Sequence, residues 1–499
     1  MADTQNQNRK PDQQRLQRPV LHIARCVLEA KMPLSLSTGN PDGVFDTAFV
    51  TDANDLPALP GSALAGVLRH LWRASYGAET HDDELFGYQK GNRGDASRLS
   101  VSWGVLLDSR GKGAEGLLPV TNQERLQDPL YQHALTLLDE PRYRNRVRLS
   151  PRGAAADTGK FDRAVLPRGH RFAIELRLWS TSVDDPSWTR LLNLLGHPGF
   201  RLGGATRAGL GKLACVACHQ RAFDLHQGKD AEALRKLPAE LDATDGLDEY
   251  RPAMSIQVVL RGTLHLSPRG FWRIGQGNDD PRGKQADKPA DLLPVREQVV
   301  DHDKGKLPVF IDELLLPAAS LKGALAHRMS FHARRFSEKP VWASKENPPK
   351  DERPKEVDVL LGSVKDKTGG QAGALFIDDA FLPLENNRLK EIPHNSIDRF
   401  TGGVRNRVLY SELSIHGNAE PITIELTLDL DRLSGSSADL SSVRRALQAT
   451  MDDLYQGRLA LGSRTTTGNG FFTGTLEGEL ATWLDAIDEA APSQRKETA

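Results

Sequence analysis

Two aspartates, Asp46 and Asp291, stand in loops ahead of helical sequences and are the first candidates for chemistry. Asp46 lies in GVFDTAFVTD and Asp291 lies in ADLLPVRE. A lone aspartate is most often a turn former or a helix cap. A carboxylate in such a loop can also hold a hydrated divalent cation or accept a proton. Local sequence alone leaves both interpretations open.

Arginine is dense in the run RYRNRVRLSPRG, residues 142–153. Four of these arginines occupy alternate positions: Arg142, Arg144, Arg146 and Arg148. An extended strand would show all of them on one face, where they can neutralise successive phosphates of a nucleic acid strand. The alternative is a solvated strand edge that charge protects from pairing. Three arginines hold the comparable part of the second half: Arg399, Arg405 and Arg407.

Two glycine-rich loops, LGGATRAGLG (residues 202–211) and LGSRTTTGNG (residues 461–470), are candidates for phosphate contact. Backbone N–H groups of a glycine-rich turn approach phosphate closely, and Arg207 and Arg464 add charge. A plain hairpin turn is the alternative. GLGKLA also matches a dinucleotide fingerprint, but KLACVACHQ follows it and reads as a strand where that fold needs a helix.

The run CVACH, from Cys215 to His219, matches the attachment pattern of c-type haem. Haem attachment requires export, and the polar N-terminus has no apolar signal sequence. Two sulfurs and one histidine fall short of four zinc ligands. We therefore expect buried strand cysteines.

Composition sets broad limits on the class of protein. The chain has 499 residues and an apolar fraction of 38%, which suits two or three domains. Its formal net charge of −1 does not by itself indicate a nucleic-acid partner. With three cysteines in all, a disulfide framework is not expected. No apolar run approaches the length of a membrane span. We expect a soluble, cytoplasmic protein that does not bind membranes.

The two halves of the chain repeat each other. The helical sequences PGSALAGVLRH and PAASLKGALAHR align Gly66 with Gly323, 257 residues apart, and the glycine-rich loops lie 259 apart. RVRLSPRGAAADTGKF stands opposite HNSIDRFTGGVRNRVLY at an offset of about 249, and Asp46 stands opposite Asp291 at 245. Four motifs therefore recur in the same order. Ser62 is the expected N-cap of the first helix.

Each half reads as strand, helix, several strands, helix and strand, which is the order of a ferredoxin-like α+β unit. The first strands are VLHIARCVLEA and MSIQVVLRGTLHL. The sequence predicts five segments: a disordered leader (1–17), a first domain (18–225), a linker (226–250), a second domain (251–478) and a C-terminal tail (479–499). Long polar insertions at 275–288 and 336–355 decorate the second half.

These motifs resemble the RAMP superfamily of CRISPR-Cas proteins, and within it the backbone subunits of type III effector complexes. The resemblance rests on HNSIDRFTGG, on both helical motifs and on the glycine-rich loops. It implies two tandem RRM-like domains fused in one chain, as in some type III-D variants. The implied partners are guide RNA, target RNA and other Cas subunits.

The family pattern at the helix start is roughly P-x-S-S-L-K-G-x-x-R, and each half departs from it. The first half keeps Ser62 and Arg69 but lacks the lysine. The second keeps Ser320 and Lys322 and has Arg328 near the place of the missing arginine. The resemblance makes these residues RNA contacts, beside the arginines of the two arginine-rich runs and of the glycine-rich loops. Aromatic residues are only 6% of the chain, so we expect RNA to be held by its backbone more than by base stacking.

Asp46 and Asp291 match the place where backbone RAMP proteins carry an aspartate that cuts target RNA. The resemblance thus implies a metal-dependent endoribonuclease with two cutting positions, and magnesium is the expected cation at each aspartate. Four nearby aspartates are alternatives: Asp52, Asp55, Asp301 and Asp303. Other hypotheses are a purely RNA-binding scaffold and, less favoured, a guide-processing endoribonuclease of the same superfamily.

Overall fold

The computed structural model describes residues 18–37, 49–77, 82–139, 144–149, 155–253, 259–275, 277, 280, 282, 288–337, 353–363, 370–384, 388–406, 408–417, 420–436 and 438–486. The chain forms two compact units. Unit 1 comprises Met1–Thr206, Leu210–Ile256 and Val300–Val309. Unit 2 comprises Arg207–Gly209, Gln257–Val299 and Phe310–Ala499.

The central sheet of unit 1 has the strand order of a ferredoxin-like fold. Its four main strands are, in spatial order, β9 (Leu213–Asp224), β1 (Val20–Ala30), β8 (Arg171–Ser180) and β4 (Leu99–Val101). All three pairings between them are antiparallel. Numbered along the chain, this order is 4-1-3-2. Two short strands extend the sheet: β10 (Asp248–Glu249) on β9 and β5 (Val105–Leu106) on β8.

Helices cover both faces of this sheet. On one face, α2 (Gly61–Tyr76) and α5 (Pro186–Asn193) bury leucines and tryptophans against β1 and β8. On the other face, α6 (Gly228–Lys236) packs beside a small cluster of Leu21, Ile23 and Phe223. The stretch expected to be a linker, residues 226–250, therefore forms α6 and β10 within unit 1.

The central sheet of unit 2 has the same strand order. Its strands are, in spatial order, β15 (Leu375–Ile377), β19 (Ile422–Asp429), β11 (Val259–Pro268) and β20 (Phe472–Glu477). Their pairings are again antiparallel. In chain order this sheet reads 2-3-1-4, which is 4-1-3-2 seen from the other end. The predicted fold class, two tandem ferredoxin-like domains, is confirmed.

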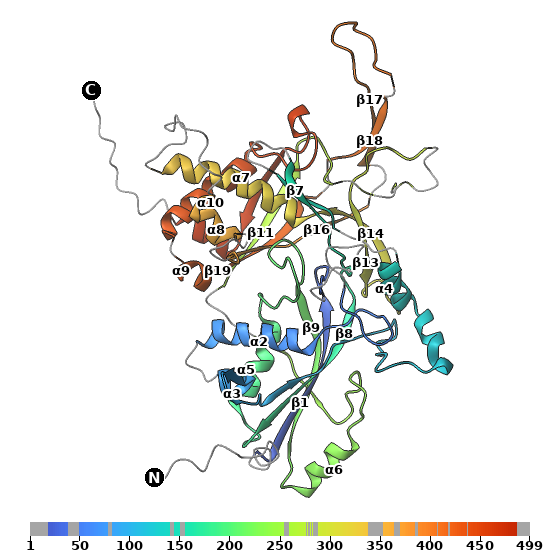
Figure 1. Ribbon diagram of the computed structural model, residues 1–499, viewed down its shortest axis with the longest axis vertical. Helices are drawn as coiled ribbons and strands as arrows, with labels where there is room; N and C mark the ends of the chain where they lie inside the picture. The colour runs from blue at the N-terminus through green and yellow to red at the C-terminus, as the bar shows by residue number, and fades with distance from the viewer. Residues whose placement is uncertain are drawn as a thin grey trace, which may run out of the picture. The chain divides into compact units, whose positions relative to one another are not determined.

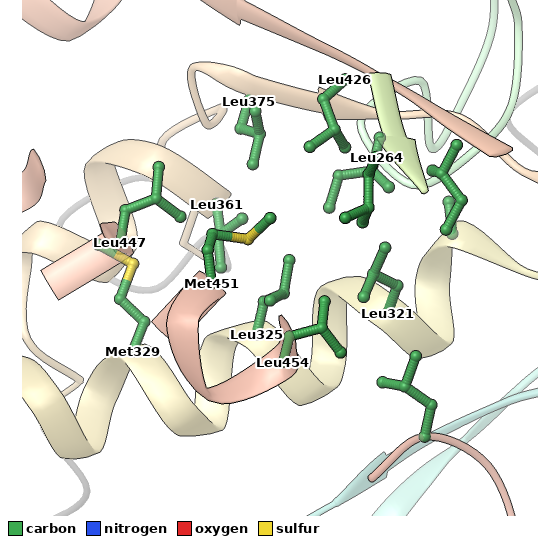
Figure 2. Close-up of a cluster of buried hydrophobic side chains, with 14 of the residues drawn as sticks. Leu264, Leu321, Leu325, Met329, Leu361, Leu375, Leu426, Leu447, Met451 and Leu454 are labelled. Carbon is green, nitrogen blue, oxygen red and sulfur yellow. The ribbon is translucent and has the colours of Figure 1, made fainter. Parts of the chain in front are cut away.

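The core of unit 2 lies between its sheet and three helices, α7 (Ala318–Phe336), α8 (Lys355–Leu361) and α10 (Leu440–Tyr455), which gather together in Figure 1. Leu321, Leu325 and Met329 recur along the inner face of α7 and meet Met451 of α10 and Leu264 of β11 in one apolar cluster (Figure 2). Burying a leucine fully contributes about 1.5–3 kcal/mol. The helical spacing seen in the sequence thus marks the core-facing side.

An inserted hairpin occupies the same topological place in each unit, between the second and third strands of the sheet. In unit 1 it is β6 (Arg146–Leu149) with β7 (Ala155–Phe161). In unit 2 it is β17 (Leu389–His394) with β18 (Tyr410–His416). These are the segments that the sequence repeat aligns.

The remaining elements join or flank these sheets. The helices are α3 (Asp82–Phe86), α4 (Pro129–Asp139), α9 (Leu430–Ser434) and α11 (Glu479–Asp485). The strands are β2 (Tyr88–Lys90), β3 (Arg93–Asp95), β12 (Phe271–Trp272), β13 (Arg296–Asp301), β14 (Val309–Leu316) and β16 (Ala380–Pro383). No helix in the described part of the chain has both the length and the apolar character that crossing a bilayer requires.

The two glycine-rich loops have the same backbone conformation. Positive φ angles occur at four pairs of positions, each 259 residues apart: Gly203 and Gly462 (89° and 91°), Ala205 and Arg464 (55° and 56°), Gly209 and Gly468 (94° and 94°), and Gly211 and Gly470 (85° and 78°). The same hydrogen bond closes both loops, from Leu202 N–H to Gly211 O and from Leu461 N–H to Gly470 O, each 2.8 Å. The duplication seen in the sequence therefore extends to backbone geometry.

Close approach of the backbone makes glycine necessary in these loops. A Cβ added at Gly470 would lie 2.0 Å from Leu461 O, and one added at Gly211 would lie 2.3 Å from Leu202 O. A left-handed conformation costs an L-residue about 1–2 kcal/mol even without a clash. Gly470→Ala combines both penalties.

We predict that Gly470→Ala lowers the free energy of unfolding by at least about 2 kcal/mol, measured by urea denaturation followed by circular dichroism. The matched control is Gly323→Ala in α7 of the same unit, where an added Cβ meets nothing within 4 Å. That helical substitution should stabilise by about 0.5–1 kcal/mol. Equal stability of Gly470→Ala and the parent would contradict this account of the loop.

Candidate nucleic-acid interface

Arg464 stands at the left-handed position of the second glycine-rich loop, with φ of 56°. Its carbonyl oxygen accepts hydrogen bonds from the N–H groups of Thr467 and Asn469, at 3.0 and 3.2 Å. Its guanidinium reaches β18, where Nη1 donates to the hydroxyl of Tyr410 at 2.8 Å. The equivalent residue of the first loop is Ala205. The two loops therefore have the same backbone conformation at this position, but only the second carries a charged side chain.

A buried carboxylate, Glu412 of β18, gathers basic side chains around itself. Its Oε1 accepts from Arg273 Nε at 3.0 Å, and its Oε2 lies 3.5 Å from Arg464 Nε and 3.4 Å from His394 Nε2. Removing one member of a buried ion pair leaves the other charge uncompensated and costs about 3–5 kcal/mol. Glu412 therefore anchors the base of the β17–β18 hairpin.

Asp291 is exposed and is held beside the same strand. Its Oδ2 accepts a hydrogen bond from Ser411 N–H at 2.8 Å, and Leu292 forms a parallel bridge with Glu412. Asp291 and Arg464 are thus both fixed by consecutive residues of β18, Tyr410 to Glu412. Of the residues predicted from the sequence, these two are brought together.

A second carboxylate, Asp280, holds the residue before Asp291. Asp280 Oδ2 accepts from Ala290 N–H at 3.1 Å and from Arg282 Nη2 at 2.7 Å. The hydrogen bond from Arg282 lowers the pKa of Asp280 to about 2, against the opposing effect of burial. Arg282 also pairs with Glu391 of β17, so this network ties the Asp291 loop to the hairpin.

The surroundings of Asp291 do not by themselves form a protein metal cage. Within the described ranges, the single group of three or more potential metal ligands whose donor atoms lie close together consists of cysteines and not of carboxylates. A cation at Asp291 would need its other ligands from water or from RNA phosphate, which is usual for Mg²⁺. The donor set therefore fits a hydrated magnesium ion held by one carboxylate.

Asp46, the other predicted cutting residue, lies outside the described residues. Two of the alternative aspartates act in turns. Asp52 Oδ1 accepts from the N–H groups of Asn54 and Leu56 at 2.7 and 3.0 Å, and Asp301 Oδ1 accepts from Asp303 N–H at 2.8 Å. Burial raises the pKa of Asp52 despite these hydrogen bonds.

The helix starts differ from the sequence expectation. The N-cap of α2 is Pro60, without a side-chain capping bond, and Ser62 is an exposed residue of the first turn. The prediction that Ser62 caps the helix is therefore wrong, because the N-cap lies two residues earlier, at Pro60. In α7, Asp379 Oδ1 accepts from Ala318 N–H at 2.7 Å and supplies the cap from the link between β15 and β16. Ser320 and Lys322 follow it in half-buried positions.

Three further arginines predicted to bind RNA are, like Arg464, paired within their own unit. Arg69 donates to Asp82 at 2.8 Å and to Gly87 O at 2.9 Å. Arg207 stacks over the ring of Phe376 at 4.6 Å and donates to the carbonyl of Gly373. Arg328 pairs with Asp453.

The Arg328–Asp453 pair belongs to a larger network, in which Arg458 and His332 also bind the carboxylate, each at 2.7 Å. Burial would raise the pKa of Asp453, but the hydrogen bonds from Arg328, His332 and Arg458 outweigh it and lower the pKa to about 2. The arginine at this position therefore stabilises the helix pair α7 and α10.

The arginines of the first hairpin are divided between the interior and the surface. Arg144 precedes β6 and is buried, with 8% of its surface exposed. Arg146 is half-buried and Arg148 is exposed, both within β6. A register shift between Val147 and Leu149 interrupts the strand alternation. Arg144 is therefore not part of an exposed stripe, Arg146 and Arg148 remain the candidates for RNA contact in β6, and Arg142 lies outside the described residues.

The second hairpin carries exposed arginines at its tip. Arg399 and Arg405 are exposed between β17 and β18, which project together in Figure 1. Asp398 Oδ1 accepts from the N–H groups of Phe400 and Thr401 and shapes the turn. Phe400 is 97% exposed, so this tip presents both charge and an aromatic face. Arg407 lies outside the described residues.

A family model for the RAMP superfamily matches the chain twice, at residues 27–214 and 272–473. The two matches fall on the two halves with the duplicated sheet order and loops. The chain belongs to the RAMP superfamily. RAMP proteins bind RNA and work within Cas complexes, so the family places the chain among CRISPR-associated RNA-binding subunits. A comparison with curated proteins finds no match.

Sequence reasoning missed the residues that hold the candidate site together. Glu412, Tyr410 and Arg273 connect the glycine-rich loop to the hairpin. Each glycine-rich loop is also held by a carbonyl group from an earlier part of its half. Gly204 N–H donates to Ser35 O, and Ser463 N–H donates to Arg273 O, each at 2.9 Å. Ser35 and Arg273, 238 residues apart, therefore hold equivalent positions. Extending the repeat alignment to the segment around Arg273 would have pointed to this residue. The pairing with Glu412 depends on the fold and left no local pattern.

Replacing an exposed arginine should change the salt dependence of RNA binding, whereas replacing an internally paired arginine should not. Arg399→Ala and Arg405→Ala should each reduce the salt dependence of binding to single-stranded RNA. The slope of log K against log salt should fall by about 0.7 for each phosphate that the variant no longer neutralises. Fluorescence anisotropy with a labelled single-stranded RNA measures this slope.

Arg69→Ala is the matched control for these two variants, because Arg69 is paired within its own unit. This change should lower the unfolding midpoint and leave the salt slope unchanged. A slope lowered equally in all three variants would contradict the division between exposed and internally paired arginines.

Proposed function

We propose that the chain is a backbone subunit of a type III CRISPR effector complex, in which each half holds guide RNA and a loop aspartate cuts the paired target RNA. The observation that carries the proposal is the duplicated glycine-rich loop, with the same positive-φ positions 259 residues apart in two ferredoxin-like units. In unit 2 this loop is linked through β18 to the exposed carboxylate of Asp291. A repeated RNA-holding unit with its own acidic loop suits two cuts in one target strand.

The chemistry requires little of the protein. RNA carries its own nucleophile in the 2′-hydroxyl, so the subunit needs to orient the backbone and stabilise charge at the scissile phosphate. Asp291, with one oxygen held by Ser411 N–H, has a fixed direction and remains open to solvent. It would accept the proton or hold a hydrated cation, magnesium in this proposal, which supplies positive charge at the phosphate. Asp46 has the same role in the first half.

Guide binding would rely on the phosphate backbone. The exposed arginines of both hairpins, Arg148, Arg399 and Arg405, supply charge without base-specific geometry. This mode of binding suits a subunit that must accept any guide sequence.

A non-catalytic scaffold is the second candidate, and one observation favours it. Among the described residues, no second carboxylate joins Asp291 in a group of metal ligands. If one hydrated carboxylate is too weak a site, the subunit holds RNA and does not cut it. The two candidates differ in whether target RNA shortens with magnesium and stays whole with a chelator.

The direct test uses the assembled complex with guide RNA and an end-labelled target. Asp291→Ala should reduce one cut at least about 100-fold and leave the other, because loss of a positioned acid–base or metal-holding group typically costs about 10²–10⁴ in rate. Asp46→Ala should remove the other cut, and target binding should survive both changes. Denaturing gels map the cut positions.

Asp303→Ala is the matched control, since Asp303 is exposed and is close to Asp291 in sequence. Both cuts should persist in that variant. If both Ala variants cut like the parent, the catalytic assignment of Asp46 and Asp291 is wrong. If Asp303→Ala loses the cut that Asp291→Ala retains, the residue assignment is wrong.

A further inference from the structure

The three cysteines of the chain, Cys26, Cys215 and Cys218, come together in the core of unit 1. They are the only cysteines among 499 residues, and their sulfurs all lie within 4.8 Å of one another. Cys26 Sγ donates to Cys218 Sγ at 3.0 Å across the β1–β9 pair. Cys26 and Cys218 are 192 residues apart in sequence, so this convergence is a property of the fold and not of a local motif.

A bulge in β9 turns Cys215 toward the other two sulfurs. Residues three apart on a regular strand point to opposite faces. The register with β1 shifts between Val27 and Leu28, which pair with Ala217 and Cys215, so Val216 is the extra residue. Val216 is 41% exposed, whereas Cys215 returns to the face of Cys218. Bulges of this kind re-aim a side chain and occur next to functional sites.

The environment of the three thiols favours loss of a proton from one of them. Hydrogen bonds from the thiols of Cys218 and Cys26 lower the pKa of Cys215 to about 4. The interaction with Cys215 raises the pKa of Cys26 and Cys218. A metal ion that binds thiols displaces their protons.

We propose that Cys26, Cys215 and Cys218 bind one thiophilic metal ion of the Zn²⁺ or Cu⁺ class and that this ion ties β1 to β9. Zn–S bonds of about 2.3 Å place the sulfurs of a tetrahedral site about 3.8 Å apart, which the observed cluster accommodates with small side-chain shifts. Soft thiolate ligands select such ions over magnesium or calcium. The site lies in the apolar core of unit 1 and uses no residue of the RNA surface.

The neighbouring groups limit what else the cluster can be. His219, which completes the haem-like motif, pairs with Arg25 one position beyond the Cys26–Cys218 pair and therefore lies on the opposite face of the sheet. The sequence expectation of inert buried cysteines considered only Cys215 and Cys218. A fourth ligand of a tetrahedral ion would come from solvent beside Cys215, which is partly exposed while the other two are buried.

The test uses the full chain, purified with a thiol reductant and without chelator. Elemental analysis should find about one zinc or copper per chain, and Cd²⁺ added to the chelated protein should give a thiolate-to-metal charge-transfer band that saturates at one equivalent. Cys215→Ser should weaken Cd²⁺ binding at least about tenfold. Val216→Ala, which keeps all three sulfurs, should bind like the parent.

Two further measurements test the proposal even if Cys215→Ser folds poorly. Cd²⁺ should raise the melting temperature of the parent and of Val216→Ala, since binding to the folded state stabilises it. Parent protein with three titratable thiols that takes up no Cd²⁺ would overturn the proposal. A mass lower by two thiol hydrogens in freshly purified protein, without bound metal, would show a disulfide and overturn it as well.

Discussion

The left-handed turn at Arg464 is the constraint on which the arrangement in unit 2 depends. Its backbone conformation closes the glycine-rich loop, and its guanidinium fixes Tyr410 and Glu412 of β18. The next link is Ser411, whose N–H holds Asp291. Loop, hairpin base and acidic residue are therefore one connected structure. A residue with φ > 0 outside glycine persists only where its surroundings determine it, and here the N–H groups of Thr467 and Asn469, which donate to the Arg464 carbonyl, hold the turn.

Unit 1 has the same backbone conformation in its glycine-rich loop but different charged side chains around it. Ala205 has nearly the same φ as Arg464 but carries no guanidinium. The buried ion pair of unit 1 lies elsewhere, between Arg25 of β1 and Glu175 of β8, at 2.8 Å. Backbone geometry is thus retained in both units, while ionic anchoring differs. The same division applies to the arginines, of which Arg69 and Arg328 stabilise helices and Arg399 and Arg405 face solvent.

The fold could be predicted from the sequence because its signals are local and repeated. The strand Val20–Ala30 was predicted with the bounds that it has, and helical spacing marked the buried side of α7. Ser62 was misassigned because a serine shortly after a proline resembles a cap, whereas the helix has already begun at Gly61. Pairings such as Glu412 with Arg273, or Cys26 with Cys218, join residues 139 and 192 apart and leave no local pattern. The proposed catalytic roles of Asp46 and Asp291 stay predictions.

The central claim is that both halves hold RNA through equivalent surfaces, the inserted hairpin and the glycine-rich loop of each unit. Ultraviolet cross-linking of the RNA-bound chain, followed by peptide mass spectrometry, tests it most directly. The account predicts cross-linked peptides from both hairpins, Arg146–Phe161 and Leu389–His416, and from both glycine-rich loops. Cross-links confined to one half, or found mainly on the helical faces around α6 and α10, would contradict it.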